Sequence, residues 1–297
     1  MGGGMKRRKT TKKFPFQSKF MKVKASRIHY IDVGEGDPIV FLHGVPASNY
    51  IWRNIIPHLS CHARCIAPDL IGMGKSAKPD IEYTIFDHIE YIKDFIDSLK
   101  LKNITLVLHG LGSIVGLYYA LSNQKNIKAI AFYESYVHPV NDPSKLSLPV
   151  KHLLSMMQNE DGCYKAIVEN NYFFKKLFPH AVLRKLDKDE LAYYEAPFKK
   201  PEHRKPLWKY VQHMKCFHIG ELKALMHSFA NYLKESLAPK LLMYSMPGFL
   251  TTMESVQWCR ENFPNTEVVD LGDGYHYAQE TNPDMFGKAL QEWYVSL

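Results

Sequence analysis

Between residues 39 and 132, short apolar runs alternate with amphipathic stretches, and this alternation constrains the fold more than any other feature of the chain. The stretch Thr84–Leu99 has apolar residues at helical spacing, and the apolar runs around it are Ile39–Leu42, Cys65–Ala67, Ile104–Leu108 and Ile127–Phe132. Strands that alternate with helices form βαβ units, whose strands are parallel and share one sheet. The sequence therefore predicts an α/β domain with a mostly parallel central sheet flanked by helices.

The flanking segments extend this pattern in both directions. Phe20–Val33 alternates and then turns at residues 34–38, which predicts a hairpin that leads into the strand Ile39–Leu42. A helix is expected over Tyr50–Leu59. Towards the C-terminus the expected elements are strand Lys240–Met243, helix Met253–Asn262, strand Glu267–Asp270 and a last helix from Pro283.

Residues 137–223 differ from the rest, because they are rich in Met, Tyr and Lys at helical spacing. Helices are expected over Leu153–Met157, Tyr164–Leu177 and Leu191–Phe198. We therefore predict a core domain made of residues 19–136 and 224–297, interrupted by a helical cap over 137–223. Residues 1–18 are predicted to be a flexible basic arm.

Positive charge is concentrated in that arm. The chain has 38 Lys and Arg against 30 Asp and Glu, a formal net charge of +8, and much of the excess lies in Lys6, Arg7, Arg8, Lys9, Lys12 and Lys13. Such a run can contact an anionic surface weakly or direct the protein to a compartment, although a solvated tail is the simpler interpretation. No base-reading motif accompanies it, so no specific nucleic acid partner is expected.

The cysteine pattern and the absence of long apolar runs indicate a soluble, cytoplasmic protein. Five cysteines, an odd number, favour reduced thiols over a disulfide framework. Cys61 and Cys65 have no second Cys/His pair at zinc-binding spacing, so neither a metal nor a cofactor is expected. No apolar run approaches the roughly 18 residues that a membrane span requires.

Functional groups of a parallel α/β sheet collect at the carboxyl ends of its strands. The first such loop begins with His43 and Gly44, directly after the strand Ile39–Leu42. A glycine there lets the backbone approach a substrate, and the next residue, Val45, can supply one backbone N–H of an oxyanion hole. We therefore predict that His43, Gly44 and Val45 border a substrate site.

The second loop lies where a nucleophile elbow should be, between the strand Ile104–Leu108 and the helix that follows. The motif needs a nucleophile two residues before a glycine, and counting back from Gly112 places Gly110 at that position. No Ser, Cys or Asp stands there. Ser113 lies one residue beyond the second glycine, inside the first helical turn, so we expect its hydroxyl to bond locally rather than to attack a substrate.

Two further loops supply an acid and a base. Glu134 comes just past the strand Ile127–Phe132, and His276 follows the strand Glu267–Asp270 near the end of the chain, in the order acid then histidine that a triad requires. We predict that Glu134 and His276 pair as a dyad, with Gly110 at the position that a nucleophile would fill.

These loops occur in long stretches that identify a family. From Lys22 to the C-terminus the chain resembles the haloalkane dehalogenases and the similar coelenterazine luciferases, which have the α/β-hydrolase fold. The resemblance rests on Tyr30–Gly34, Pro46–Asn54, Pro68–Ser76, Glu169–Phe173, Ala192–Phe198, Pro247–Gly248, Phe263–Glu267 and His276–Glu280.

The resemblance also implies where this chain departs from its family. The family's nucleophilic aspartate, on which a covalent alkyl ester forms, falls on Gly110, whereas its acid and base fall on Glu134 and His276. Its two halide-binding side chains, an asparagine and a tryptophan, fall on Val45 and Leu111, which have no side-chain donors. Backbone N–H groups of these two residues remain available for an oxyanion hole.

The leading hypothesis is a pseudoenzyme: a dehalogenase-like protein that is inactive as a dehalogenase and binds a small apolar molecule between core and cap, or a partner. The alternative is a hydrolase, lyase or cofactor-free oxygenase that uses the Glu134–His276 dyad as a general base without a covalent intermediate. Two other hypotheses remain. One is a luciferase-like oxygenation. The other is an interaction module that binds a partner through the basic arm and the cluster Lys199, Lys200, Arg204 and Lys205.

Overall fold

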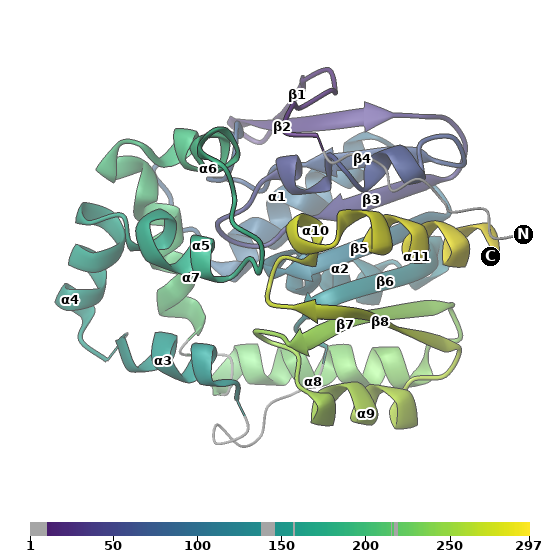
Figure 1. The fold of residues 1–297 in the computed structure, drawn as a ribbon. Coiled ribbons are helices and arrows are strands. Elements are labelled where there is room, and N and C mark those ends of the chain that lie inside the picture. Colours follow the sequence, from purple (N-terminus) through teal and green to yellow (C-terminus); the bar gives the residue numbers. More distant parts are fainter. Residues whose placement is uncertain (1–10, 138–145, 157, 215, 217–218) are drawn as a thin grey trace, which may run out of the picture.

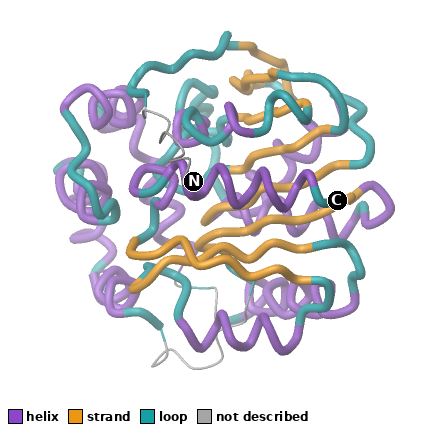
Figure 2. Tube along the Cα trace, turned by 45° about the vertical axis from the view of Figure 1, so that its right-hand side comes forward, coloured by secondary structure: helices purple, strands orange, loops and turns teal. Residues whose placement is uncertain are grey.

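A single sheet organises the molecule. The computed structural model describes residues 11–137, 146–156, 158–214, 216 and 219–297. Eight strands of this described part form one twisted sheet in the order β1-β2-β4-β3-β5-β6-β7-β8 (Figures 1 and 2). β2 pairs antiparallel with β1 and β4, and the other pairs are parallel. The predicted α/β class, with a mostly parallel sheet, is confirmed. The strands are β1 (Lys19–Val23), β2 (Ser26–Val33), β3 (Pro38–Leu42), β4 (Arg64–Pro68), β5 (Ile104–Gly110), β6 (Ile127–Ser135), β7 (Lys240–Pro247) and β8 (Thr266–Gly274).

Helices cover both faces of the sheet. On one face α2 packs against β5, β6, α1 and α8, and on the other α11 packs against β7 and β8. Figure 1 shows α11 in front of the sheet with α1 and α2 behind it. The helices are α1 (Ile85–Ser98), α2 (Leu111–Ser122), α3 (Leu148–Met156), α4 (Glu160–Tyr164), α5 (Phe178–His180), α6 (Lys188–Glu195), α7 (Lys205–Met214), α8 (Gly220–Glu235), α9 (Met253–Asn262), α10 (Ala278–Thr281) and α11 (Pro283–Val295).

α1 illustrates how the sequence sets these elements. Thr84 caps its first turn by accepting from the backbone N–H of Asp87, whose side chain in turn accepts from the N–H of Thr84. Ile85, Ile89 and Ile92 are buried at helical spacing on the side that meets the sheet layer. The predicted helix over 84–99 is confirmed, as is the helix Met253–Asn262, which is α9.

Two expectations near the N-terminus are wrong. The turn at 34–38 does not join neighbouring strands, because β4 lies between β2 and β3; the hairpin is formed by β1 and β2. β3 is buried throughout, and a strand buried on both faces belongs in the parallel interior of the sheet. The expected helix over Tyr50–Leu59 is replaced by two short 3-10 helices, Asn49–Trp52 and Ile56–His58, because Pro57 has no N–H with which to continue an α-helical ladder.

The segment between β6 and β7 is helical, as expected. Helices α3 to α7 lie beyond the carboxyl ends of the parallel strands, on the left of Figure 1. The expected helix Tyr164–Leu177 is interrupted and includes two π-helical turns, Lys165–Glu169 and Phe173–Leu177. Met157 lies outside the described residues. α8 spans the expected boundary at residue 223 and packs on α2 in the core, so a cap limited to 137–223 stays a prediction.

The described part of the expected N-terminal arm, residues 11–18, lies against the body. The N–H of Thr11 donates to Asn54 Oδ1 at 2.8 Å, and the Tyr50 hydroxyl donates to the carbonyl of Lys12 at 2.5 Å. The ring of Phe14 lies 6.0 Å from that of Tyr50. Lys6 to Lys9, the rest of the basic run, lie outside the described residues.

Candidate active site

The turn between β5 and α2 has the geometry of a nucleophile elbow. β5 ends at Gly110 and α2 begins at the next residue, with Gly110 at φ 52° and ψ −127°. The elbow packs so tightly on the neighbouring strand that a Cβ on Gly112 would come within 2.3 Å of the carbonyl oxygen of Leu42. Such a sharp strand-to-helix turn presents the residue at its apex above the edge of the sheet. That residue is Gly110.

The apex faces a histidine. A Cβ atom placed on Gly110 would lie 3.5 Å from His276 Nε2 and 3.1 Å from the Cα of Gly44. A side chain at this position would therefore extend between the imidazole and the loop that follows β3. Because the residue is glycine, the elbow brings no nucleophilic atom to His276.

Glu134 and His276 form the predicted pair. His276 Nδ1 lies 2.9 Å from Glu134 Oε2, and Glu134 is buried with a left-handed φ of 48°. The carboxylate also accepts the backbone N–H groups of Phe249 at 3.1 Å, Leu250 at 2.6 Å and Thr251 at 3.0 Å, all in the loop after β7. Four donors thus hold one carboxylate in place, which fixes the orientation of the imidazole.

This arrangement assigns the proton of the imidazole. A carboxylate can only accept, so Nδ1 carries a hydrogen, and Nε2 is the ring nitrogen that faces Gly110. Nε2 makes no hydrogen bond to any described residue. His109 supports the backbone of this loop, because its Nε2 donates to the carbonyl of His276 at 2.9 Å. Burial holds the pKa of His109 well below its ordinary value, and the nearby His276 lowers it further.

Ser113 is committed to the elbow itself. Its hydroxyl donates to the carbonyl of Gly110 at 2.6 Å and accepts the backbone N–H of Tyr136 at 2.9 Å. The side chain is fully buried. This confirms the expectation that the Ser113 hydroxyl bonds locally.

Val45 and Leu111 stand on the two loops that meet at Gly110, and both are buried. The carbonyl of Val45 accepts the hydroxyl of Tyr277 at 2.9 Å, which ties the loop after β3 to the histidine loop. Neither side chain can donate a hydrogen bond. Their predicted role, as backbone donors of an oxyanion hole lined by apolar side chains, stays a prediction.

His43 acts within the protein framework. Its Nδ1 donates to the carbonyl of Gly44 at 2.8 Å, and its Nε2 accepts the backbone N–H of Leu70 at 3.0 Å. Burial lowers the pKa of His43, which keeps the ring neutral and suits one donated and one accepted hydrogen bond. The side chain therefore positions the loop on which Gly44 and Val45 stand.

A buried charge network that the sequence did not reveal joins the core to α6. Arg53 binds both oxygens of Glu280 on α10, and its Nη2 also lies 3.0 Å from Glu190 on α6. Arg184 contacts the same two carboxylates, each at 2.7 Å from Nη2. The sequence offers no signal for this network, because Arg53 is separated from Glu190 by 137 residues and from Glu280 by 227 residues along the chain.

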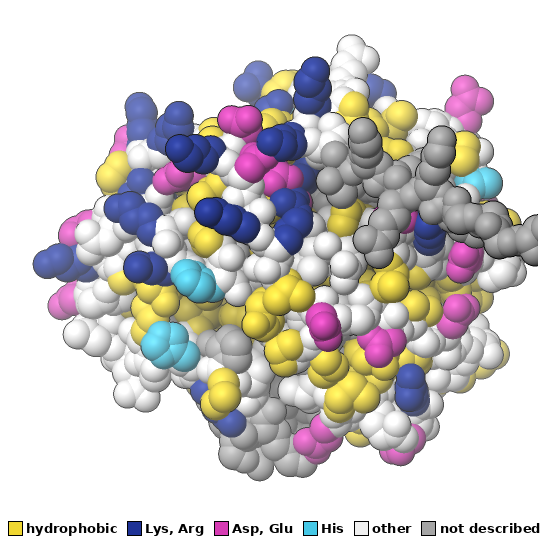
Figure 3. Space-filling model, viewed as in Figure 1, with side chains coloured by type: hydrophobic (Ala, Val, Ile, Leu, Met, Phe, Trp, Pro, Cys, Tyr) yellow, Lys and Arg dark blue, Asp and Glu magenta, His cyan; other side chains and the backbone are white. Residues whose placement is uncertain are grey.

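The basic cluster proposed for partner binding is partly structural. Arg204 is buried and donates to the backbone carbonyls of Phe198, Val168 and Lys199. Lys205 pairs with Asp80 at 2.7 Å. Lys and Arg side chains do gather on the upper left of the face in Figure 3, over α6 and its neighbours.

No helix in the described ranges is long and apolar enough to cross a membrane. In the same part of the chain, no three His, Cys, Asp or Glu side chains come together in a way that could hold a metal ion.

Comparison with known proteins agrees with this fold. Residues 37–161 match the family model described as alpha/beta hydrolase fold. A haloalkane dehalogenase of Mesorhizobium japonicum is 34% identical over 272 residues, covering 90% of this chain and 88% of that protein. A coelenterazine h 2-monooxygenase of Renilla reniformis is 34% identical over 283 residues, covering 93% of this chain and 89% of that protein.

Solved structures give the same assignment. The haloalkane dehalogenase DatA from Agrobacterium tumefaciens C58 superposes with a TM-score of 0.89 at 33% identity, covering 94% of this chain and 96% of that one. DbeA from Bradyrhizobium elkani superposes with a TM-score of 0.90 at 30% identity, covering 95% of this chain and 98% of that one. The chain therefore belongs to the haloalkane-dehalogenase-like family of the α/β-hydrolase fold.

Proposed function

We propose that this protein is a dehalogenase-like pseudoenzyme that releases no halide and binds a small apolar molecule beside Gly110. The observation that carries the proposal is the glycine at the apex of the elbow, opposite His276 Nε2. Formation of an alkyl ester needs a carboxylate at that apex, and glycine supplies none. The nearby hydroxyl of Ser113 is engaged by Gly110 and Tyr136 and cannot take its place.

The character of the surrounding side chains supports an apolar ligand. Val45 and Leu111 stand where the family carries halide-binding donors, and both are buried aliphatic residues. A site without side-chain donors leaves a departing halide unstabilised, whereas it imposes no desolvation cost on an apolar molecule. The missing nucleophile and the missing halide donors thus both favour binding of an apolar molecule over dehalogenation.

Binding of neutral apolar probes tests this function. We expect indole or 1-octanol to raise the melting temperature of the wild-type protein, because a ligand that binds only the folded state stabilises it. Val45→Asn and Leu111→Gln should weaken this effect by adding polar groups to the wall, whereas Leu183→Gln, at a side chain that is 49% exposed, should leave it unchanged. The proposal fails if no neutral apolar compound stabilises the wild type, or if all variants respond equally.

A second candidate function rests on the geometry of His276. Its Nδ1 is 2.9 Å from an anchored carboxylate, and its Nε2 has no partner among the described residues. This is the arrangement of a general base, which can act on water or on an acidic C–H or O–H of a substrate without a covalent step. Activity of this kind should depend on pH with one histidine-like limb and should disappear in His276→Ala; activity that survives that substitution would exclude it.

A further inference from the structure

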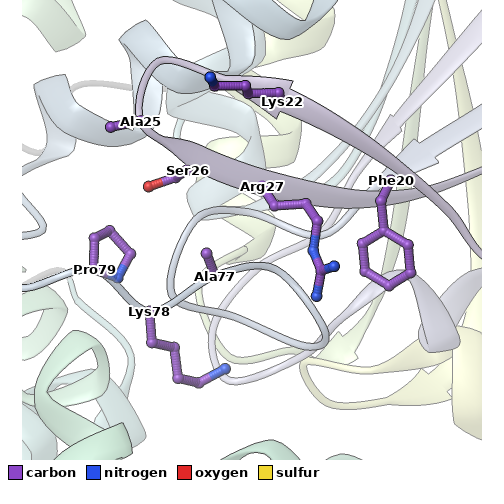
Figure 4. A pocket seen from close by; sticks show the side chains of 8 residues that line it. All are labelled: Phe20, Lys22, Ala25, Ser26, Arg27, Ala77, Lys78 and Pro79. Carbon is purple, nitrogen blue, oxygen red and sulfur yellow. The ribbon is translucent and has the colours of Figure 1, made fainter.

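A hollow of about 610 Å³ lies at the far edge of the sheet, between the β1–β2 hairpin and the loop that follows β4. None of its residues belongs to the site around Gly110. Its lining consists of Phe20, Lys22, Ala25, Ser26, Arg27, Ala77, Lys78 and Pro79 (Figure 4). The hollow is therefore a separate feature of the molecule, with walls of basic and apolar side chains.

The charge of this lining is of one sign. Lys22, Arg27 and Lys78 line the hollow, and no acidic side chain does. Figure 4 shows Arg27 on β2 and Lys78 on the loop after β4, both among the side chains that line the hollow. Cations that converge without an anion create a positive potential inside a concave site.

These cations differ from others on the same hairpin. Neither Arg27 nor Lys78 forms an ion pair with a carboxylate of the described residues, although the carboxylate of Asp69 attracts Lys78 from beyond contact distance. Lys24, at the turn of the hairpin, is by contrast paired with Glu90. The two side chains that reach into the hollow are therefore the ones whose charge remains available to a ligand.

Contacts among the residues that line the hollow fix its shape. The guanidinium of Arg27 lies 4.3 Å from the centre of the Phe20 ring, which supports one of its faces and leaves its N–H groups at the edge free to donate. The backbone N–H of Ala77 donates to the carbonyl of Arg27 at 2.9 Å and ties the loop to β2. These contacts fix Arg27 and the loop that carries Lys78 relative to each other before a ligand arrives.

Lys78 is a half-buried ammonium group. Its Nζ donates to the carbonyl of Gly74 at 3.1 Å and lies 5.2 Å from the centre of the Phe198 ring. Burial lowers the pKa of Lys78 to about 8. An ammonium in such surroundings gains more from an arriving anion than a fully hydrated one does, because less water has to be displaced from it.

We propose that this hollow binds a soluble small molecule that carries a phosphomonoester, with the phosphate between Arg27 and Lys78. Two cations match the charge of a phosphate dianion better than that of a single carboxylate, and a guanidinium edge fits two phosphate oxygens. The organic part of the ligand packs against the apolar wall of Phe20, Ala77 and Pro79.

Calorimetric titration with phenyl phosphate tests the proposal, since this probe joins a phosphomonoester to an apolar ring. We expect saturable binding at one site, weakened about tenfold or more by Arg27→Gln and by Lys78→Met, because each removes a charge-assisted hydrogen bond. Lys24→Gln is the matched control, with the same change of charge on the same hairpin outside the lining, and it should bind like the wild type. A far-UV circular dichroism spectrum that matches the wild type establishes that each variant folds.

Other results would overturn the proposal. Absence of binding at millimolar phenyl phosphate would do so, as would binding that Arg27→Gln and Lys78→Met leave intact. If benzoate bound as tightly as phenyl phosphate, the hollow would be a general anion site and not one for phosphomonoesters. Binding only to phosphatidylcholine vesicles that contain phosphatidylinositol 4-phosphate, and not to phenyl phosphate, would assign the surface to a lipid headgroup instead.

Discussion

His276 points its Nε2 at the apex of the elbow, where a Cβ on Gly110 would lie 3.5 Å away. The imidazole is thus oriented for a side chain that the chain does not have. Its partner Glu134 remains anchored by three backbone N–H groups. The site therefore holds an acid and a histidine as a hydrogen-bonded pair, with a glycine at the position that faces the histidine.

Restoring the nucleophile alone should restore little dehalogenation. Gly110→Asp supplies a carboxylate, but Val45 and Leu111 still provide no side-chain donors for the halide. We expect the triple variant Gly110→Asp, Val45→Asn, Leu111→Trp to release halide about a hundredfold faster than Gly110→Asp, in line with the value of one such donor. Gly110→Ala is the control, because it adds the strain of a Cβ at φ 52° without the carboxylate. Rapid turnover by Gly110→Asp alone would contradict this prediction.

Glu134→Gln should destabilise the fold. The carboxylate accepts hydrogen bonds from three backbone N–H groups and from His276, whereas a glutamine has only one carbonyl oxygen to accept them. Its NH2 group would also face N–H groups that can only donate. We expect the free energy of unfolding in urea to fall by about 2–4 kcal/mol. Glu267→Gln, at an exposed position on β8, is the matched control and should change it by less than about 0.5 kcal/mol. Equal losses for the two variants would count against the anchoring role of Glu134.

Arg53→Met tests the network between the core and α6. The substitution leaves the fully buried carboxylate of Glu280 without its principal partner, and we expect a loss of about 3–5 kcal/mol in the free energy of unfolding. Arg53→Met with Glu280→Gln should recover part of that loss, since it removes the unpaired charge. Arg64→Met, which breaks a half-exposed pair with Asp32, should cost about 1 kcal/mol or less. An Arg53→Met variant as stable as the wild type would show that the network is dispensable.

Stability should fall as the pH falls below neutrality, and His88 supplies part of that dependence. Burial lowers the pKa of His88 to about 3, and neither ring nitrogen has a hydrogen-bond partner in the part of the chain that the structure describes. Below the unfolded pKa of about 6.5 the unfolded chain binds a proton at this residue and the folded chain does not, so stability is full above that pH and is lost progressively down to the folded pKa.

Replacement of His88 isolates its contribution. His88→Leu should make the fall in unfolding free energy between pH 6 and 4 shallower by about 1.4 kcal/mol per pH unit, because one fewer proton is taken up on unfolding. His152→Leu, which removes an exposed imidazole, should leave the slope unchanged. Urea titrations at several pH values measure both slopes, and identical slopes for His88→Leu and the wild type would refute the assignment.

Much of this site could be predicted from the sequence because its residues lie at the carboxyl ends of strands or just past them. Gly110, Glu134 and His276 come at strand ends, and parallel strands bring their carboxyl ends to one edge of the sheet. The role of His43 in holding its own loop could not be foreseen, since it depends on the distant N–H of Leu70. The order of β2, β4 and β3 was likewise inaccessible to a local turn rule, because burial on both faces, not chain proximity, decides which strands are central.

Halide release by the wild-type protein is the decisive measurement for the proposed lack of dehalogenase activity. The assay follows bromide and iodide release from a panel of short haloalkanes, with a dehalogenase relative as the active reference and His276→Ala as the internal control. Because Gly110 offers no carboxylate to form an ester, we expect release no faster than in buffer alone for every substrate. Release above that background, lost in His276→Ala, would contradict it.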